Sequence, residues 1–281
     1  MDTATQDQRP PIDPTPLHRA VRHARIWRRF LIIALSREAQ FRANAISTII
    51  VGTAHIVVSL IPIVILFEFT SDVQGWSRPE VIALSGLFQI VTGLLDTFVT
   101  ANMSRFTGLV ANGELDPVLL RPMSSQFYTT FRWIAPSSFF STIAGVLIML
   151  FGLNLAGASP GPIEIAAAIV ITLCGTVLLT CFCAAMIYLV FWSTSVHSIS
   201  SLFSDLWYTG GYPTAFFPRG IRAFLSFVFP VAFATTVPME TLLGRGSLVQ
   251  VGIAVTAAAV AILAIRTWWR FAVRFYSSAS S

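Results

Sequence analysis

Long apolar runs make up most of the chain, and shorter polar or proline-containing segments separate them. About 20 consecutive apolar residues are enough for a helix to cross the hydrocarbon of a bilayer. Six runs meet or approach this length, near residues 43–67, 81–100, 131–151, 163–191, 196–212 and 248–267. The pattern therefore predicts an all-α polytopic membrane protein with six transmembrane helices.

The composition supports this class. Of the 281 residues, 55% are hydrophobic and 11% are charged, whereas a soluble domain carries about 25% charged residues. The length fits a single transmembrane domain over residues 17–281 and leaves no room for a separate catalytic domain. Residues 1–16 are polar and contain four prolines, so we expect a disordered cytoplasmic tail without a signal peptide.

Arginine alternates with bulky apolar residues over residues 17–42. This composition, which includes Trp27 among Arg25, Arg28 and Arg29, is typical of an amphipathic helix that lies in the membrane interface. A positively charged flank with no further role is the alternative, and both interpretations place this end in the cytoplasm. Nucleic-acid binding is disfavoured because the segment leads directly into a predicted span.

The fifth run is polar for a membrane span. It contains His197, four serines and Asp205, so it must face protein or a water-filled path rather than lipid on all sides. Asp205 and His55 are the better candidates for lining a polar path. Glu68 and Asp96 are expected near span ends, at the level of the lipid headgroups.

Residues 213–246 are apolar but contain four prolines. Arginine near both chain ends predicts two cytoplasmic termini, and two cytoplasmic termini require an even number of spans. We therefore predict an outer re-entrant helix pair here rather than a seventh span, with its broken backbone covered by protein or a cavity. Arg219, Arg222 and Arg245 in and beside this segment run against the positive-inside rule.

No sequence signature of catalysis is evident. A phosphate-binding G-x-x-x-x-G-K-[ST] loop is absent, and the chain contains no lysine. The four histidines are scattered, and Cys174, Cys181 and Cys183 are expected to pack rather than to bind metal. We expect that this chain is not an enzyme and that it binds no cofactor or metal.

One short stretch, residues 113–124, lies between the second and third predicted spans. Leu115, Val118 and Leu119 follow at i, i+3 and i+4 and give one apolar face, while Glu114 and Asp116 suit the positive end of a short helix. The stretch is either a plain interfacial turn or a docking helix for a soluble subunit, with the apolar face open to that partner.

The motif G-E-L-D-x-x-L-L-R-P in this stretch resembles that of bacterial ABC type-2 exporter permeases. Tyr212-Pro213, Phe217-Pro218, Pro230-Val231-Ala232-Phe233 and Pro238 match the same group in the same order, and the resemblance covers most of the chain after about Arg37. It implies a location in the bacterial cytoplasmic (inner) membrane. It also implies a separate ABC ATPase subunit that binds ATP and Mg²⁺, and a second permease, identical or related.

The resemblance also assigns roles to residues. It implies contact with the ATPase by Gly113, Glu114, Leu115, Asp116, Leu119 and Arg121. It implies an outer gate that includes Tyr212, Pro213, Phe217, Pro218, Pro230 and Pro238. The predicted function is therefore ATP-driven export of an amphiphilic or polar molecule, whether drug-like, lipid-linked or a glycan. An ion-coupled secondary transporter and a non-transporting membrane anchor are the alternatives, and co-purification of an ATPase would separate the three.

Overall fold

A computed structural model describes residues 16–121, 123–192 and 206–276 of the chain. Most of the predicted fifth span, with His197 and Asp205, and the predicted tail lie outside the described residues. The first half contains α1 (Pro16–Gln40), α2 (Arg42–Glu68), β1 (Asp72–Val73), β2 (Trp76–Ser77), α3 (Arg78–Leu95), η1 (Asp96–Thr100), α4 (Ala101–Ala111), α5 (Asp116–Leu119) and α6 (Ser125–Phe131). The rest contains η2 (Pro136–Ser138), α7 (Phe139–Leu155), α8 (Pro162–Ile187), η3 (Tyr188–Phe191), η4 (Thr209–Gly211), η5 (Thr214–Phe216), α10 (Arg219–Ala223), η6 (Phe224–Val228), α11 (Val231–Ala234), α12 (Thr236–Leu242), α13 (Leu248–Ala272) and η7 (Val273–Phe275).

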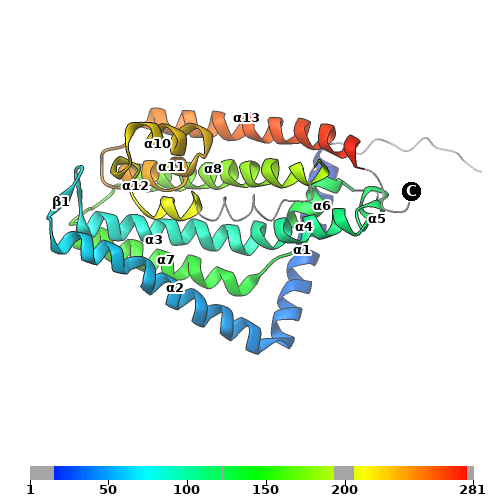
Figure 1. The fold of residues 1–281 in the computed structure, drawn as a ribbon, viewed down its shortest axis with the longest axis horizontal. Helices are drawn as coiled ribbons and strands as arrows, with labels where there is room; N and C mark the ends of the chain where they lie inside the picture. The colour runs from blue at the N-terminus through cyan, green and yellow to red at the C-terminus, as the bar shows by residue number, and fades with distance from the viewer. Residues whose placement is uncertain (1–15, 122, 193–205, 277–281) are drawn as a thin grey trace, which may run out of the picture.

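The prediction of an all-α polytopic membrane protein is confirmed. Within the described ranges, five helical stretches are long and apolar enough to cross a membrane, or up to six if one bent pair counts as a span. The long helices run side by side, with the β1–β2 hairpin at one end and α5 at the other (Figure 1). We call these the hairpin end and the loop end. The end of α13 and η7 also lie at the loop end.

The structure moves the limits of two predicted spans. The second is part of one continuous helical stretch, Arg78–Ala111, whose 34 residues extend about 50 Å at 1.5 Å per residue and therefore reach beyond the hydrocarbon. The third begins at Pro136 rather than at residue 131, because residues 132–135 are not helical.

Close backbone contact between α3 and α7 forms the centre of the bundle. A Cβ atom built on Gly145 would lie 2.6 Å from the carbonyl oxygen of Gly86, so only glycine fits there, as at other tight membrane helix crossings. By contrast, α2 and α13 are each only 11% buried over their most apolar windows. Their remaining apolar surface faces lipid or another subunit.

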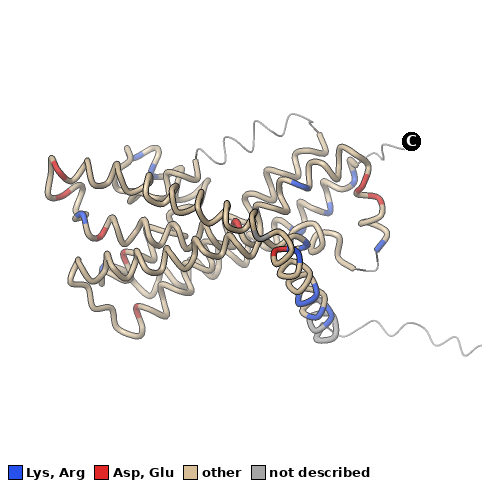
Figure 2. Tube along the Cα trace, turned by 90° about the horizontal axis from the view of Figure 1, so that it is seen from below, with Lys and Arg blue, Asp and Glu red and all other residues tan. Residues whose placement is uncertain are grey.

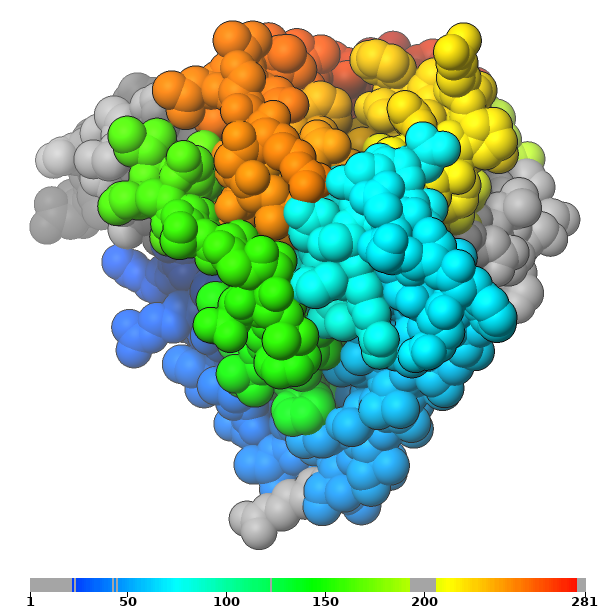
Figure 3. All heavy atoms as spheres, turned by 90° about the vertical axis from the view of Figure 1, so that its left-hand side faces the viewer, coloured from blue at the N-terminus to red at the C-terminus, as the bar shows by residue number. Residues whose placement is uncertain are grey.

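The proline-rich segment folds at the hairpin end. Its two limbs, Arg219–Val228 and Val231–Leu242, are bent by 70° at Pro230, and α10, α11 and α12 all lie at this end (Figure 1). Viewed onto the hairpin end, the hairpin, the α10 region and the start of α13 lie side by side (Figure 3). Both limbs thus return to one end, as a re-entrant pair would, and its membrane depth stays a prediction.

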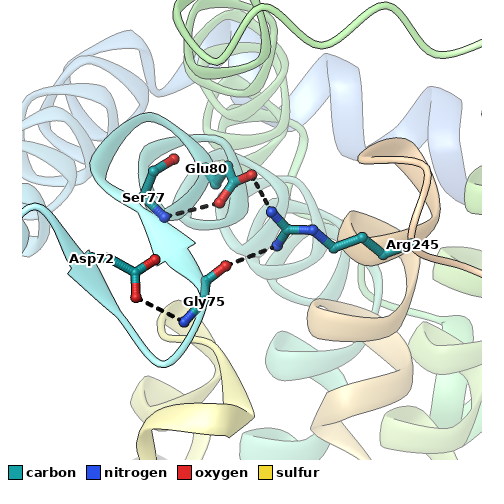
Figure 4. Close-up of polar contacts among 5 residues, drawn as sticks. All are labelled: Asp72, Gly75, Ser77, Glu80 and Arg245. Atoms are coloured by element: carbon teal, nitrogen blue, oxygen red, sulfur yellow. Dashed lines mark hydrogen bonds and ion pairs between the residues drawn. The ribbon is translucent and has the colours of Figure 1, made fainter.

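Arg245 fastens this segment to the hairpin. Its Nη2 atom lies 2.5 Å from Glu80 Oε1, and its Nη1 donates to the carbonyl oxygen of Gly75 at 3.1 Å (Figure 4). Glu80 Oε2 also accepts from the Ser77 amide at 2.9 Å, which caps the start of α3. A single carboxylate therefore joins the hairpin, α3 and the α12–α13 connection, and we call these contacts the Arg245 latch.

Candidate functional site

The loop that joins α4 to α6 contains the predicted coupling stretch. Gly113 has φ 71° and ends α4 in the left-handed conformation that glycine adopts without strain. Asp116 begins the single turn of α5, and Pro117 occupies the first turn, where its missing N–H is no loss. The local sequence thus dictates a sharp turn followed by one short helical turn.

The apolar face of this turn points into the helix bundle and not outward. Leu115 is 0% exposed and Val118 is 4% exposed, and Leu119 packs beside them. The expectation that this face is open to a partner is therefore wrong. Leu120, directly after it, is 85% exposed.

Aromatic side chains from three long helices receive Leu115 and Val118. Tyr188 and Trp269 have ring centroids 4.8 Å apart, and Phe106 lies 5.6 Å from Tyr188 and 5.9 Å from Trp269. We call these five residues the loop-end cluster. The cluster takes side chains from α4, from η3 at the end of α8 and from α13, and so joins the loop to all three.

Polar residues at the edge of the loop keep their charges near solvent. Glu114 and Arg121 are exposed, and the Arg121 guanidinium carbon lies 4.7 Å from the Tyr128 ring centroid. Asp116 is half-buried beside Tyr276 near the end of the chain. The pKa of the Tyr276 hydroxyl is raised, mainly by its own burial and then by the negative charge of Asp116.

The basic helix α1 crosses the bundle at the loop end. Arg25, Arg28 and Arg29 are exposed, whereas Trp27 is half-buried with its ring 6.1 Å from Phe98. Much of the positive charge lies on α1 and around the loop end (Figure 2). An apolar edge against the bundle and a charged outer edge agree with the predicted interfacial helix, whose position in a membrane stays a prediction.

The non-helical segment 132–135 is bound tightly to its neighbours. The Asn102 side chain is 1% exposed; its Nδ2 donates to the carbonyl oxygen of Trp133 at 2.7 Å, and its Oδ1 accepts from the Trp133 amide at 2.8 Å. The Ala135 amide donates to Thr97 O at 2.9 Å, and Arg37 donates to Ile134 O at 2.9 Å. These four backbone groups at the helix break are therefore satisfied.

Between the two ends, polar side chains gather on one side of α3 and η1. Asp96 Oδ1 accepts from Thr100 at 2.9 Å, and Trp207 Nε1 donates to Thr92 at 3.2 Å. His55 of α2 is exposed, and its ring lies 5.3 Å from that of Tyr208. Asp96 also opens a π-helical turn, a distortion found frequently at functional sites.

The predicted gate residues take several different positions. Pro218 and Pro230 directly precede α10 and α11, where each allows a sharp change of direction. Pro213 and Pro238 are buried, and Tyr212 and Phe217 are half-buried. The prolines thus shape this segment, while their role in gating stays a prediction.

Comparison with known proteins decides the family. The sequence matches the family model described as "ABC-2 family transporter protein" over residues 53–280. The chain belongs to the ABC-2 family of transporter proteins. As an ABC-2 permease, it is the multi-pass membrane subunit of an ABC transporter system and not its catalytic part. The matched range begins inside α2, so the interfacial role of α1 rests on its own residues. No curated protein and no solved structure matches the permease.

Sequence reasoning missed several structural residues of this permease. Leu120 stood beside the predicted apolar face and was not assigned a role, and Asn102 and Trp133 received none either. A polar residue such as Asn102 next to a predicted span end is the signal that could have drawn attention to the 132–135 segment. Among the described residues, no group of three His, Cys, Asp or Glu side chains could hold a metal ion.

Proposed function

We propose that the permease exports an amphiphilic or polar substrate across the bacterial cytoplasmic membrane, driven by ATP hydrolysis on a separate cytoplasmic subunit. That subunit would bind ATP and Mg²⁺, and a second permease, identical or related, would complete the translocation unit. The proposal builds on the family membership and on the geometry of the loop between α4 and α6.

The observation that carries the proposal is the combination of an exposed leucine with a buried anchor in this loop. Leu120 stands out from a turn that Leu115 and Val118 hold in the loop-end cluster. Glu114 and Arg121 are exposed close to Leu120 in sequence. An apolar anchor within a charged rim is the usual composition of a binding hot spot.

Coupling would follow from the packing of this loop. A push on Leu120 by a closing ATPase would pass through Leu115 and Val118 to the ends of α4, α8 and α13. Because a densely packed cluster cannot absorb the displacement, the helix ends would move with the loop. ATP hydrolysis outside the membrane would in this way change helix positions inside it.

The charge distribution supports an orientation with the loop end in the cytoplasm. Arginines of α1 and α13 concentrate at this end, and positive charge near spans favours the cytoplasmic side. In this orientation both termini are cytoplasmic, and the Arg245 latch and the bent helix pair lie on the outer side. His55 and Asp96 are then candidates for the substrate path, because ionisable groups within the membrane usually mark such a path.

The test is co-purification of the ATPase with matched leucine variants. Leu120→Asp should leave the permease folded and weaken ATPase binding by about 30-fold, which corresponds to about 2 kcal/mol for a lost anchor. Leu248, 67% exposed at the hairpin end, supplies the control, since Leu248→Asp should keep full binding. Leu115→Asp should instead destabilise the permease itself, because it buries a charge in the loop-end cluster.

Transport is measured in parallel as protection of cells against an exported toxin. Full ATPase binding and full transport by Leu120→Asp would show that the subunit docks elsewhere.

A further inference from the structure

Three arginines from different elements surround one indole ring at the loop end. The guanidinium carbons of Arg105, Arg132 and Arg37 lie 3.8, 4.8 and 5.4 Å from the ring centroid of Trp133. Arg37 comes from α1, Arg105 from α4 and Arg132 from the segment that follows α6. We call these four residues the arginine cluster.

The positive charge of the cluster is only partly balanced. Arg37 donates to Ile134 O and Arg132 Nε donates to Tyr128 Oη at 3.3 Å, so both contacts are with neutral groups. Among the described residues, Arg105 and Arg132 form no ion pair. Glu38 follows Arg37 in sequence, and its Oε1 accepts from the Ser137 amide at 2.8 Å. Three arginines and this one acid leave two positive charges.

The fold holds the like charges together. The two hydrogen bonds between Asn102 and the Trp133 backbone fix the residue that carries the indole ring. Contacts of cations with a ring face offset part of the repulsion. Guanidinium groups held close together suit phosphate oxygens, which arginine binds through paired hydrogen bonds.

The position of Arg105 along its helix places the cluster at headgroup depth. Arg105 follows Arg78, the first residue of α3, by 27 positions in a continuous helical stretch, which corresponds to about 40 Å. The hydrocarbon of a bilayer is about 30 Å thick. If the stretch enters the membrane near Arg78, Arg105 therefore lies roughly 10 Å beyond the hydrocarbon, at the level of lipid phosphates.

We propose that the arginine cluster binds the phosphate of an anionic membrane lipid. Exposed apolar residues at the start of α2, Phe41, Ile46 and Ile50, provide a surface for its acyl chains. A carboxylate of the ATPase is the competing ligand, and the calculated depth favours lipid because the docking loop extends further from the hydrocarbon. The proposal depends on the cytoplasmic orientation only for the choice of leaflet.

The test compares lipid binding by the complete chain in nanodiscs of phosphatidylcholine with and without phosphatidylglycerol. Native mass spectrometry counts the phosphatidylglycerol molecules that the protein retains. Arg105→Gln and Arg132→Gln should each lower this retention about tenfold. Arg28→Gln, which removes the same charge from the exposed side of α1, should lower it less than twofold. Arg132→Lys keeps the charge without the paired donors and should bind at an intermediate level.

Each other outcome overturns the proposal in a recognisable way. Equal losses for Arg28→Gln and Arg105→Gln would show diffuse attraction to the membrane and no site. Displacement of the lipid by an equal concentration of inorganic phosphate would show a phosphate site without lipid selectivity. Unchanged lipid retention with loss of ATPase co-purification would make the cluster a protein contact. Since lipid retention needs no ATPase, failure here leaves the Leu120 experiment standing.

Discussion

Removal of the Arg245 latch should loosen the hairpin without disturbing the rest of the bundle. The side chains of Arg245 and Glu80 are 43% and 12% exposed, so the energy of their contact should lie between two limiting cases. An exposed ion pair contributes about 0.2–1 kcal/mol, and a hydrogen bond to a charged group about 1.5–3 kcal/mol. Discounting for the exposed guanidinium, we expect a coupling energy of about 1 kcal/mol, or about fivefold in the hairpin opening equilibrium.

Hydrogen exchange of the hairpin amides in nanodiscs measures this equilibrium, because local opening limits exchange. The Ser77 amide should exchange about fivefold faster in Arg245→Gln and in Glu80→Gln. The double variant should exchange no faster than either single one, since both changes remove the same contact. Glu80→Gln keeps an oxygen that can accept from the Ser77 amide, so it does not remove the cap of α3.

Arg222→Gln is the matched control at the same end. Arg222 donates to the carbonyl oxygens of Thr214 and Ala215, so its loss should leave the Ser77 amide unchanged. The reasoning fails if the rates of the two single variants multiply in the double variant, or if neither single variant changes exchange at all.

Two further predictions concern topology and packing. In a background without native cysteines, Pro218→Cys and Ser247→Cys should both react with an impermeant reagent from outside, because both residues are exposed at the hairpin end. Labelling of either cysteine from the cytoplasm alone would exclude the re-entrant pair. Gly145→Ala should lower the thermal unfolding temperature strongly, because the added Cβ meets the backbone of α3. In Gly108→Ala the added Cβ has nothing within 4 Å, so the unfolding temperature should match or exceed that of the parent. Equal effects of the two changes would contradict the close packing.

The sequence revealed the class of this fold because membrane spans are a local property of composition. The bent helix pair was visible for the same reason, since its prolines interrupt an apolar run. The apolar face of the turn between α4 and α6 was also predicted correctly, because Leu115 and Val118 share one buried cluster.

What could not be read was the direction of that face. The i, i+3 spacing groups residues but does not reveal what they meet, and here Leu115 shares a buried cluster with Trp269, which is distant along the chain. The Arg245 latch was hidden for the same reason, since its partner Glu80 lies 165 residues away. Arg245 did stand out as a basic residue in the segment predicted to lie outside, and the structure pairs it with Glu80.

Backbone contact between α3 and α7 decides which parts of the permease can move. Two helices whose glycines touch cannot slide or rotate against each other without collision, because no flexible side chain separates them. They should move as one rigid unit. The continuous helical stretch extends this unit through α4 to the loop between α4 and α6. Movement within the permease would then occur where this unit meets α8 and α13, and a force on the loop between α4 and α6 would turn α3 and α7 together.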